Sequence, residues 1–253
     1  VTWQAALIIT GKRPLLTGSQ SKLAKATGEE TGHINRGLTM ASAKDAEPYL
    51  GKWNACPGST SFCEYICVGS RQGQGRLKSS DIARNGRTIV MACFYDRFMA
   101  LLIAELIRAE RSAIRKGWIL AFRTNVATDH WRLAGKLATM FPSIVFYDYT
   151  AVASAMRADD NVIRVYSRKD GRTEKALEML RAGHSAAVVF DISSRSGEPL
   201  PKTWHGFPVI DGDVNDLFFT RAPSDGPCVV GLTTKGTKQE IREARERGFS
   251  VAA

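Results

Sequence analysis

Apolar side chains recur at helical spacing in the segment between residues 88 and 117. The segment reads TIVMACFYDRFMALLIAELIRAERSAIRKG, and its apolar positions include Phe94, Phe98, Leu101, Leu102, Leu106 and Ala109. A stripe of this kind gives a helix one face to bury. Gly117 follows a basic last turn, which is the usual composition of a helix C-terminus. The pattern predicts a long helix over residues 92–116.

Beyond residue 117 the pattern changes to short, continuous apolar runs separated by amphipathic segments. The runs predict strands at 118–122, 144–147, 162–166, 186–190, 207–210 and 228–232, and the segments between them predict helices at 129–141, 150–157 and 172–182. Strands that are apolar throughout are typical of a parallel sheet covered on both faces. The predicted fold class is therefore α/β, a single domain whose parallel (βα) repeat forms a full or partial TIM-like barrel. An open sheet is the alternative.

The N-terminal part of the chain lacks this regular alternation. Residues 1–36 include the stretch TGKRPLLTGSQSKLAKATGEETGHINR, whose polar and glycine-rich composition predicts an N-terminal arm over the surface. Residues 37–240 are predicted to form the barrel-like domain, with a first strand at 37–42, a cysteine loop at 54–69 and a basic, glycine-containing loop at 70–87. Residues 241–253 are predicted to be a C-terminal tail.

Polar side chains follow the predicted strands one after another. They are Arg123, Asn125, Asp148, Ser167, Arg168, Asp191, Asp211, Asp213 and Lys235. In a parallel α/β barrel the carboxyl ends of the strands converge on one mouth, where active sites lie. Asp and Ser at strand ends also cap the helices that follow, and capping is the favoured role of Asp129 and Ser167. A site is favoured for Arg123, Asp148, Asp191 and Asp211, because capping alone does not explain an arginine and several scattered charges.

Three of the five cysteines fall in the stretch NACPGSTSFCEYICVG. Cys56, Cys63 and Cys67 have the spacing C-x6-C-x3-C, and the stretch follows the first predicted strand, so the loop is expected at the same mouth as the strand-end charges. Three thiolates on one loop can hold three irons of a [4Fe–4S] cluster and leave the fourth iron open to S-adenosylmethionine. Zinc with a fourth ligand from elsewhere is an alternative. The second alternative is a loop of partly buried thiols that binds no metal. In that case Cys93 and Cys228 are ordinary core residues.

Charge and composition narrow the class of partner. The net charge is +10 with a pI near 9.6, and residues 1–117 carry 17 Lys and Arg against 9 Asp and Glu. Such an excess favours nucleic acid or a phosphorylated small molecule, although a solvated basic surface is an equal alternative. No apolar run is long enough to cross a membrane. The N-terminus lacks the pattern of a signal peptide, so a cytoplasmic location with reduced thiols is expected. Oligomeric state is left open.

The other chemical motifs are weak. The four histidines form no HxH or HExxH pair, and neither GxGxxG after a strand nor GxxxxGK[ST] is present. Asp211, Asp213 and Asp216 offer hard oxygens to a divalent cation. An Asx-rich turn explains the same three residues, and we favour the turn.

Several stretches together resemble a family of tailed-phage proteins, the gene product 88-like family. They are GHINRGLTMASA, CPGSTSFCEYIC, FYDRFMALLIAEL, RTNVATDHW, FYDYT, DGDVNDLFF and VVGLTTKG, and they span about residues 33–236. The resemblance implies a phage origin and action inside a bacterial host. It implies no particular reaction.

In architecture the chain is also similar to the radical S-adenosylmethionine enzymes. The shared features are a cysteine loop after the first strand and a run of βα units, although the cysteines are spaced more widely than that superfamily's C-x3-C-x2-C. This similarity supports the hypothesis of an iron–sulfur enzyme acting on a nucleotide or nucleic acid. Cys56, Cys63 and Cys67 would then hold the cluster.

The strand-end residues receive roles within that hypothesis. Arginine binds carboxylates and phosphates bidentately, so the positions expected to contact cofactor or substrate are Arg123, Asn125, Ser167, Arg168 and Lys235. Asp148, Asp191 and Asp211 would orient ribose hydroxyls or transfer protons. A second hypothesis is a non-catalytic, basic nucleic-acid-binding accessory protein. A third is a metal-dependent hydrolase that uses Asp191 and Asp211.

Overall fold

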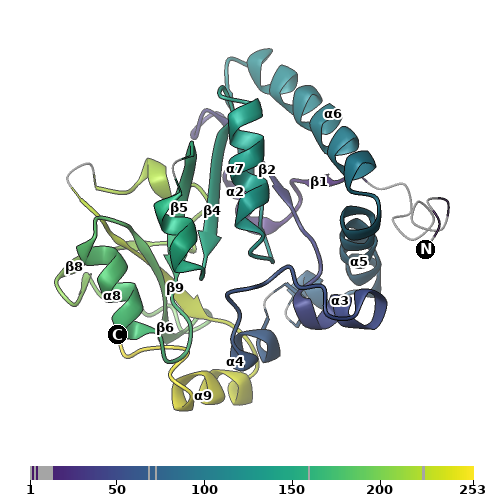
Figure 1. Ribbon diagram of the computed structural model, residues 1–253. Helices are drawn as coiled ribbons and strands as arrows, with labels where there is room; N and C mark the ends of the chain where they lie inside the picture. The colour runs from purple at the N-terminus through teal and green to yellow at the C-terminus, as the bar shows by residue number, and fades with distance from the viewer. Residues whose placement is uncertain are drawn as a thin grey trace. The chain divides into compact units, whose positions relative to one another are not determined.

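The computed structural model describes residues 14–67, 69–71, 73–158, 160–223 and 226–253, together with Thr2 and Gln4. Figure 1 shows the helices and strands of the described residues, coloured along the chain. The chain divides into two compact units. Unit 1 consists of Val1–Pro57, Cys67–Asp148 and Asp160–Val162, and unit 2 of Gly58–Ile66, Tyr149–Asp159 and Ile163–Ala253. The cysteine loop therefore contributes residues to both units.

Unit 1 is built on the strands β1 (Leu16–Thr17), β2 (His33–Leu38), β3 (Ile119–Arg123) and β4 (Val145–Thr150), whose last two residues belong to unit 2. The strands lie in the order β1-β2-β3-β4. β2, β3 and β4 run parallel, and Arg123 lies between Gly37 and Tyr147 in the register. β1 pairs antiparallel to β2. The carboxyl ends of the three parallel strands consequently share one edge of the sheet.

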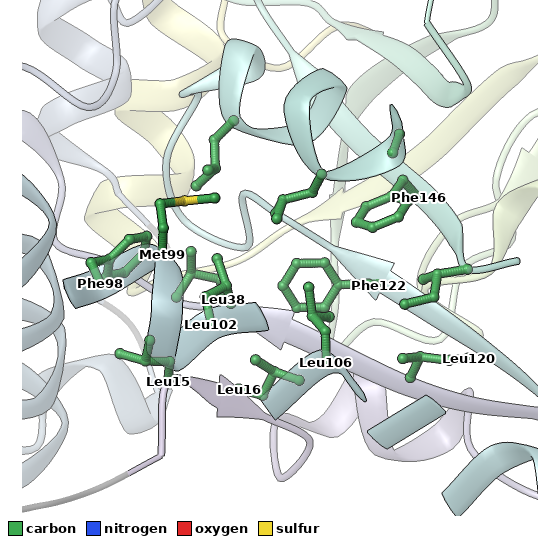
Figure 2. Packing of buried hydrophobic residues seen from close by; sticks show 14 of the residues in the cluster. Leu15, Leu16, Leu38, Phe98, Met99, Leu102, Leu106, Leu120, Phe122 and Phe146 are labelled. Carbon is green, nitrogen blue, oxygen red and sulfur yellow. The ribbon is translucent and has the colours of Figure 1, made fainter. Parts of the chain in front are cut away.

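The helices of unit 1 are α2 (Ser21–Lys25), α3 (Ala43–Leu50), α5 (Lys78–Cys93), α6 (Tyr95–Ile114), α7 (Trp131–Met140) and the 3-10 helix η1 (Gly73–Arg76). Side chains of α6 and α7 join those of β2, β3 and β4 in one apolar core. Figure 2 shows Leu102 and Leu106 of α6 with Leu38 and Phe122 in this core. The rings of Phe122 and Phe146 meet edge to face, with their centroids 5.9 Å apart.

α6 buries one face and exposes the other. Phe98, Leu102 and Leu106 recur every fourth residue and are fully buried. Burial of a side chain of this size stabilises the fold by about 1.5–3 kcal/mol. The carboxylate of Glu105 accepts hydrogen bonds from the N–H groups of Leu15 at 3.0 Å and Leu16 at 2.9 Å. The helix therefore also holds β1 in place.

α5 corrects the prediction for residues 70–116. A loop is predicted to residue 87, followed by one long helix, but helix α5 begins at Lys78, and Phe94, with φ −141° and ψ 50°, separates it from α6. The buried face of α5 is largely polar, which is why the hydrophobic pattern does not reveal it. Buried Arg87 donates to the carbonyl oxygens of Pro14 and Thr39, and buried Arg84 donates to that of Gly75.

Unit 2 has a second set of strands: β5 (Val162–Ser167, of which Val162 belongs to unit 1), β6 (Ala186–Ser193), β7 (Thr203–Trp204), β8 (Phe207–Asp211) and β9 (Val229–Thr234). They lie in the order β5-β6-β9-β8-β7. The pairs of β5 with β6, β6 with β9 and β9 with β8 are parallel, and β7 is antiparallel to β8.

The helices of unit 2 are α4 (Ser61–Tyr65), α8 (Thr173–Arg181), α9 (Lys238–Glu246) and the 3-10 helices η2 (Ala153–Arg157) and η3 (Phe218–Thr220). Thr237 and Glu240 form a capping box that starts α9. Phe62 and Ile66 pack with Ala244 and Phe249 in a small apolar cluster. That cluster attaches α4, which carries Cys63, to α9.

The predicted α/β class with mostly parallel strands is confirmed, and every strand predicted after residue 117 is present. Within neither unit do the described strands close into a ring, and closure into a barrel stays a prediction. The first strand lies at 33–38 rather than 37–42, and β1 and α2 fall within the predicted arm. Residues 1, 3 and 5–13 of that arm lie outside the described residues. α9 occupies part of the predicted tail.

Among the helices formed by the described residues, none has the length and apolar character that crossing a bilayer requires.

A methyl group at residue 37 is expected to destabilise unit 1. A Cβ on Gly37 would lie 2.4 Å from Cγ2 of Val126 and 3.0 Å from Cδ1 of Leu23. Gly37→Ala should therefore lower the free energy of unfolding by about 1–3 kcal/mol, as measured by urea denaturation. Gly226→Ala is the control, because a Cβ there meets nothing within 4 Å. Equal stability of the two variants would contradict the packing described for β2.

Candidate functional site

The carboxyl ends of β3 and β4 carry a buried polar network in unit 1. Asn125 and Asp148 are each 1% exposed, and Nδ2 of Asn125 donates to Oδ2 of Asp148. Oδ1 of Asn125 accepts hydrogen bonds from Oγ1 of Thr128 at 2.9 Å and from the N–H of His130 at 2.8 Å. A single amide therefore ties the end of β4 to the loop between β3 and α7.

Arg123 is the third predicted site residue at this edge. It ends β3, is half-buried, and donates from Nε to the carbonyl oxygen of Asn125 at 3.2 Å. The structure thus brings Arg123, Asn125 and Asp148 together. Their predicted contacts with a cofactor or substrate stay predictions.

Two further residues of unit 1, which the sequence analysis did not single out, form a buried polar pair. The hydroxyl of Tyr147 on β4 donates to Oδ1 of Asn35 on β2 at 2.9 Å, and both side chains are fully buried. Nδ2 of Asn35 has no hydrogen-bond partner among the described residues. An unpaired buried donor costs about 1–3 kcal/mol. The available signal was an asparagine in the middle of the short strand HINRGL, between Ile34 and Arg36.

His130 supplies a neutral imidazole to the same loop. Burial lowers the pKa of His130 below its usual value. Its Nδ1 is buried and makes no hydrogen bond within the part of the chain that the structure describes. His130 is therefore an uncharged member of the loop that carries Asn125.

Two of the predicted metal ligands, Cys56 and Cys67, lie against this loop. Sγ of Cys56 donates to the carbonyl oxygen of Ala127 at 3.9 Å, and the N–H of Asp129 donates to the carbonyl oxygen of Ala55. A Cβ on Gly69 would lie 2.5 Å from the Ala127 methyl group and 3.6 Å from Sγ of Cys67. Cys56 and Cys67 are thus placed near the loop that follows β3.

The third predicted ligand, Cys63, belongs to α4 in unit 2. Oγ1 of Thr60 caps this helix by accepting from the N–H of Cys63, and the same hydroxyl donates to Asp170. Nη1 of Arg172 donates to the carbonyl oxygen of Gly58 at 3.1 Å. Cys56, Cys63 and Cys67 are all half-buried free thiols.

Within the described residues, no three His, Cys, Asp or Glu side chains form a group that could hold a metal ion. Cys56 and Cys67 belong to unit 1, and Cys63 belongs to unit 2. The cluster and the zinc site both stay predictions.

Ser167 and Arg168 lie at the end of β5. Arg168 is 4% exposed and donates to the carbonyl oxygens of Gly248 at 2.7 Å and Phe249 at 2.9 Å. It also donates to Oγ1 of Thr173 at the start of α8, and burial lowers its pKa. Oγ of Ser167 accepts from Nζ of Lys169 at 3.1 Å. The Arg168 guanidinium thus joins β5, α8 and the C-terminal segment of unit 2.

Asp211 and Lys235 meet through Asp213 at the ends of β8 and β9. Oδ1 of Asp211 accepts from the N–H of Asp213 at 2.7 Å, which confirms the favoured Asx turn. Asp213 in turn accepts from the N–H and hydroxyl of Thr233 and from Nζ of Lys235 at 2.9 Å. Asp213 is therefore the residue that connects this group. The sequence analysis favoured Asp211, not Asp213, as the site residue.

Asp191 engages a different partner in unit 2. Its Oδ2 pairs with Nε of Arg245 on α9, and its Oδ1 is buried without a hydrogen-bond partner among the described residues. In the sheet order, β9 lies between β6, which carries Asp191, and β8, which carries Asp211. Asp191 and Asp211 are the two carboxylates of the hydrolase hypothesis. Asp191 pairs with Arg245, and Asp211 accepts from the N–H of Asp213.

The exposed face of α6 carries four arginines in one row, which we name the arginine stripe. Its members are Arg97, Arg108 and Arg111 on the helix and Arg115 at its C-cap, all exposed. Their separations from Arg97 are 11, 14 and 18 residues, close to whole numbers of about 3.6-residue turns. Leu101 and Ala104 fill the same row, so no carboxylate interrupts it. At about 1.5 Å per residue the stripe is about 27 Å long.

The carboxylates of α6 near the stripe are already engaged. Glu105 accepts the two N–H groups at β1, and Glu110 accepts from Oγ of Ser143. Within the described part of the chain, neither Arg108, Arg111 nor Arg115 forms a side-chain ion pair. These three arginines of the stripe therefore present positive charge without an ion-pair partner among the described residues.

The Asn125–Asp148 bond is expected to stabilise unit 1. Asn125→Asp removes the donor and sets a second carboxylate beside buried Asp148. It should lower the free energy of unfolding by on the order of 3 kcal/mol, as measured by chemical denaturation. In the double variant Asn125→Asp/Asp148→Asn, one amide again lies beside one carboxylate. It should therefore regain much of the free energy of unfolding that the single variant loses. Additive destabilisation in the double variant would contradict the bond.

Comparison with known proteins places the chain in a family. The sequence model described as Gene product 88 matches residues 14–252, a range that includes the polar network, the cysteine loop and the arginine stripe. Comparison with curated proteins and with solved structures gives no significant match. The match extends over nearly the whole sequence, and the chain belongs to the Gene product 88 family.

Proposed function

We propose that this phage-type protein binds nucleic acid through the arginine stripe of α6. The observation that carries the proposal is a row of four exposed arginines, with no carboxylate between them, on a helix whose other face is buried. Nucleic-acid backbones present phosphates at short, regular intervals, and most contacts to them come from arginine and lysine. Guanidinium groups bind phosphate oxygens with two hydrogen bonds.

The distribution of charge along the sequence supports this proposal. Residues 1–117, which include α6, carry 17 Lys and Arg against 9 Asp and Glu. The remaining residues therefore hold a nearly balanced share of the total of 35 and 25. A polyanion is attracted to the side of a protein where such an excess gathers. A non-catalytic accessory role in the cytoplasm of a bacterial host accounts for these features without a metal.

Removal of three stripe arginines should weaken binding to a short DNA duplex. In the triple variant Arg108→Gln, Arg111→Gln and Arg115→Gln, we expect roughly tenfold or greater loss of affinity at moderate salt. Because each phosphate contact contributes about 0.9 to the slope of log affinity against log salt concentration, the slope should fall by about 2.7. Fluorescence anisotropy at several salt concentrations measures both quantities.

A control variant must lose the same charge elsewhere. Arg157, Arg181 and Arg195 are exposed residues of unit 2, and Glu178, which Arg157 contacts, retains Lys175 as a partner. Their joint replacement by Gln should leave the affinity and the salt slope near those of the wild type. Equal weakening by the two triple variants would show that net charge, rather than the stripe, governs binding.

A second candidate is the iron–sulfur enzyme, supported by the placement of Cys56 and Cys67 against the loop that carries Asn125. Cys56, Cys63 and Cys67 would hold a [4Fe–4S] cluster, and the open iron would bind S-adenosylmethionine for radical chemistry. Asn125 would orient Asp148 toward a nucleotide substrate, and Arg123 would contact its phosphate. This candidate also includes the proposal that the strands close into a full or partial barrel.

Metal analysis tests the second candidate. Protein purified without oxygen should contain about four irons and matching sulfide per chain. Cys63→Ser should lose most of this iron, whereas Cys93→Ser, at an exposed thiol outside the loop, should retain it. Zinc without iron would instead indicate a structural zinc site. Wild-type protein free of iron, sulfide and zinc would contradict any metal role for the loop.

A further inference from the structure

A cavity of about 240 Å³ lies in unit 1 between β1, β2 and α6. Its lining consists of Pro14, Leu16, Arg36, Glu105, Arg108 and Ala109. Arg108 is also a member of the arginine stripe, so the cavity adjoins the proposed nucleic-acid surface. We name it the Arg36 cavity.

Positive charge dominates the Arg36 cavity. Nη1 of Arg36 donates only to the carbonyl oxygen of Asn35, at 2.9 Å, and within the described residues neither Arg36 nor Arg108 has an ion-pair partner. Burial lowers the pKa of Arg36, a sign that its guanidinium has lost part of its hydration. The carboxylate of Glu105 already accepts the N–H groups of Leu15 and Leu16. Two guanidiniums therefore share the cavity with one carboxylate that is committed to the backbone.

Gly18 leaves the space in which the Arg36 guanidinium lies. A Cβ on Gly18 would lie 2.6 Å from Nη1 and 3.1 Å from Cζ of Arg36. Any larger residue at position 18 would displace the guanidinium. The sequence thus combines a half-buried arginine on β2, Arg36, with a glycine at position 18 that leaves room for its guanidinium.

We propose that the Arg36 cavity binds a phosphate monoester, held between the guanidiniums of Arg36 and Arg108. A monoester carries about −1.5 to −2 charges at neutral pH and a backbone diester carries one. The two guanidiniums and the single Glu105 carboxylate leave the cavity with net positive charge, which attracts the more highly charged monoester more strongly. The volume is below the roughly 300–1,000 Å³ of pockets that enclose drug-sized ligands. The cavity therefore takes a single phosphate group rather than a whole nucleotide.

The phosphate can come from two sources. One is the terminal phosphate of a strand that lies along the arginine stripe, and this source rests on the proposed function. The other is a free phosphorylated small molecule, which does not depend on nucleic-acid binding. Both share the same monoester chemistry, so separate probes distinguish them.

The first experiment compares two single-stranded DNA oligonucleotides of one sequence, one with a 5′-phosphate and one with a 5′-hydroxyl. Wild-type protein should bind the phosphorylated strand about tenfold more tightly, the effect of one charge-assisted pair. Arg36→Gln and Arg108→Gln should abolish this preference. Arg111→Gln, which lies on the stripe outside the cavity, should weaken binding to both strands and keep the preference. The exposed position of Arg108 makes its variant safe for folding.

The second experiment titrates ribose 5-phosphate into wild-type protein by calorimetry, with ribose as the control. Binding that is lost in Arg36→Gln and Arg108→Gln but kept in Arg111→Gln would support the cavity as a small-molecule site, even if the protein does not bind DNA. A strand preference unchanged in both cavity variants would overturn the proposal. So would the absence of any preference combined with no binding of ribose 5-phosphate.

Discussion

The packing of α6 against β2 and β3 is the interaction on which the other features of unit 1 depend. Phe98, Leu102 and Leu106 bury one face of the helix in the core (Figure 2), and the helical repeat then forces the arginines to the opposite, solvated face. The same packing sets Glu105 beside β1, where its carboxylate holds two N–H groups. Both the arginine stripe and the Arg36 cavity follow from this one arrangement.

The polar edge of unit 1 is a separate consequence of parallel pairing. Because β2, β3 and β4 point the same way, Asn125 and Asp148 lie at one edge of the sheet. The hydrogen bond between Tyr147 on β4 and Asn35 on β2 passes over the strand between them, β3. Such buried networks are rigid where their groups are paired and costly where they are not. Cys56 adjoins this edge through its contact with the carbonyl oxygen of Ala127. The stripe and this edge are distinct features, which is why binding and catalysis are proposed and tested independently.

Much of the fold was predictable because strands buried on both faces must be apolar. The strands after residue 117 follow from that rule, and the convergence of Arg123 with Asp148 follows from their position at strand ends. The sequence does not predict α5, because Arg84 and Arg87 bury their side chains against backbone carbonyl groups. A hydrophobic pattern does not identify a helix face that buries charged side chains. The bond between Asn35 and Tyr147 joins residues 112 positions apart, so only the tertiary structure reveals it. The arginine stripe, in contrast, is visible in the sequence once the helix is assigned.

Hydroxyl-radical footprinting with and without a DNA duplex tests the central claim most directly. Leu101 lies within the arginine stripe and is 40% exposed, and Val214 in unit 2 is 48% exposed and serves as the reference. The account predicts that bound DNA lowers the oxidation of Leu101 and leaves that of Val214 unchanged. Unchanged oxidation of Leu101 under conditions where DNA is bound would contradict the assignment of α6 as the nucleic-acid surface.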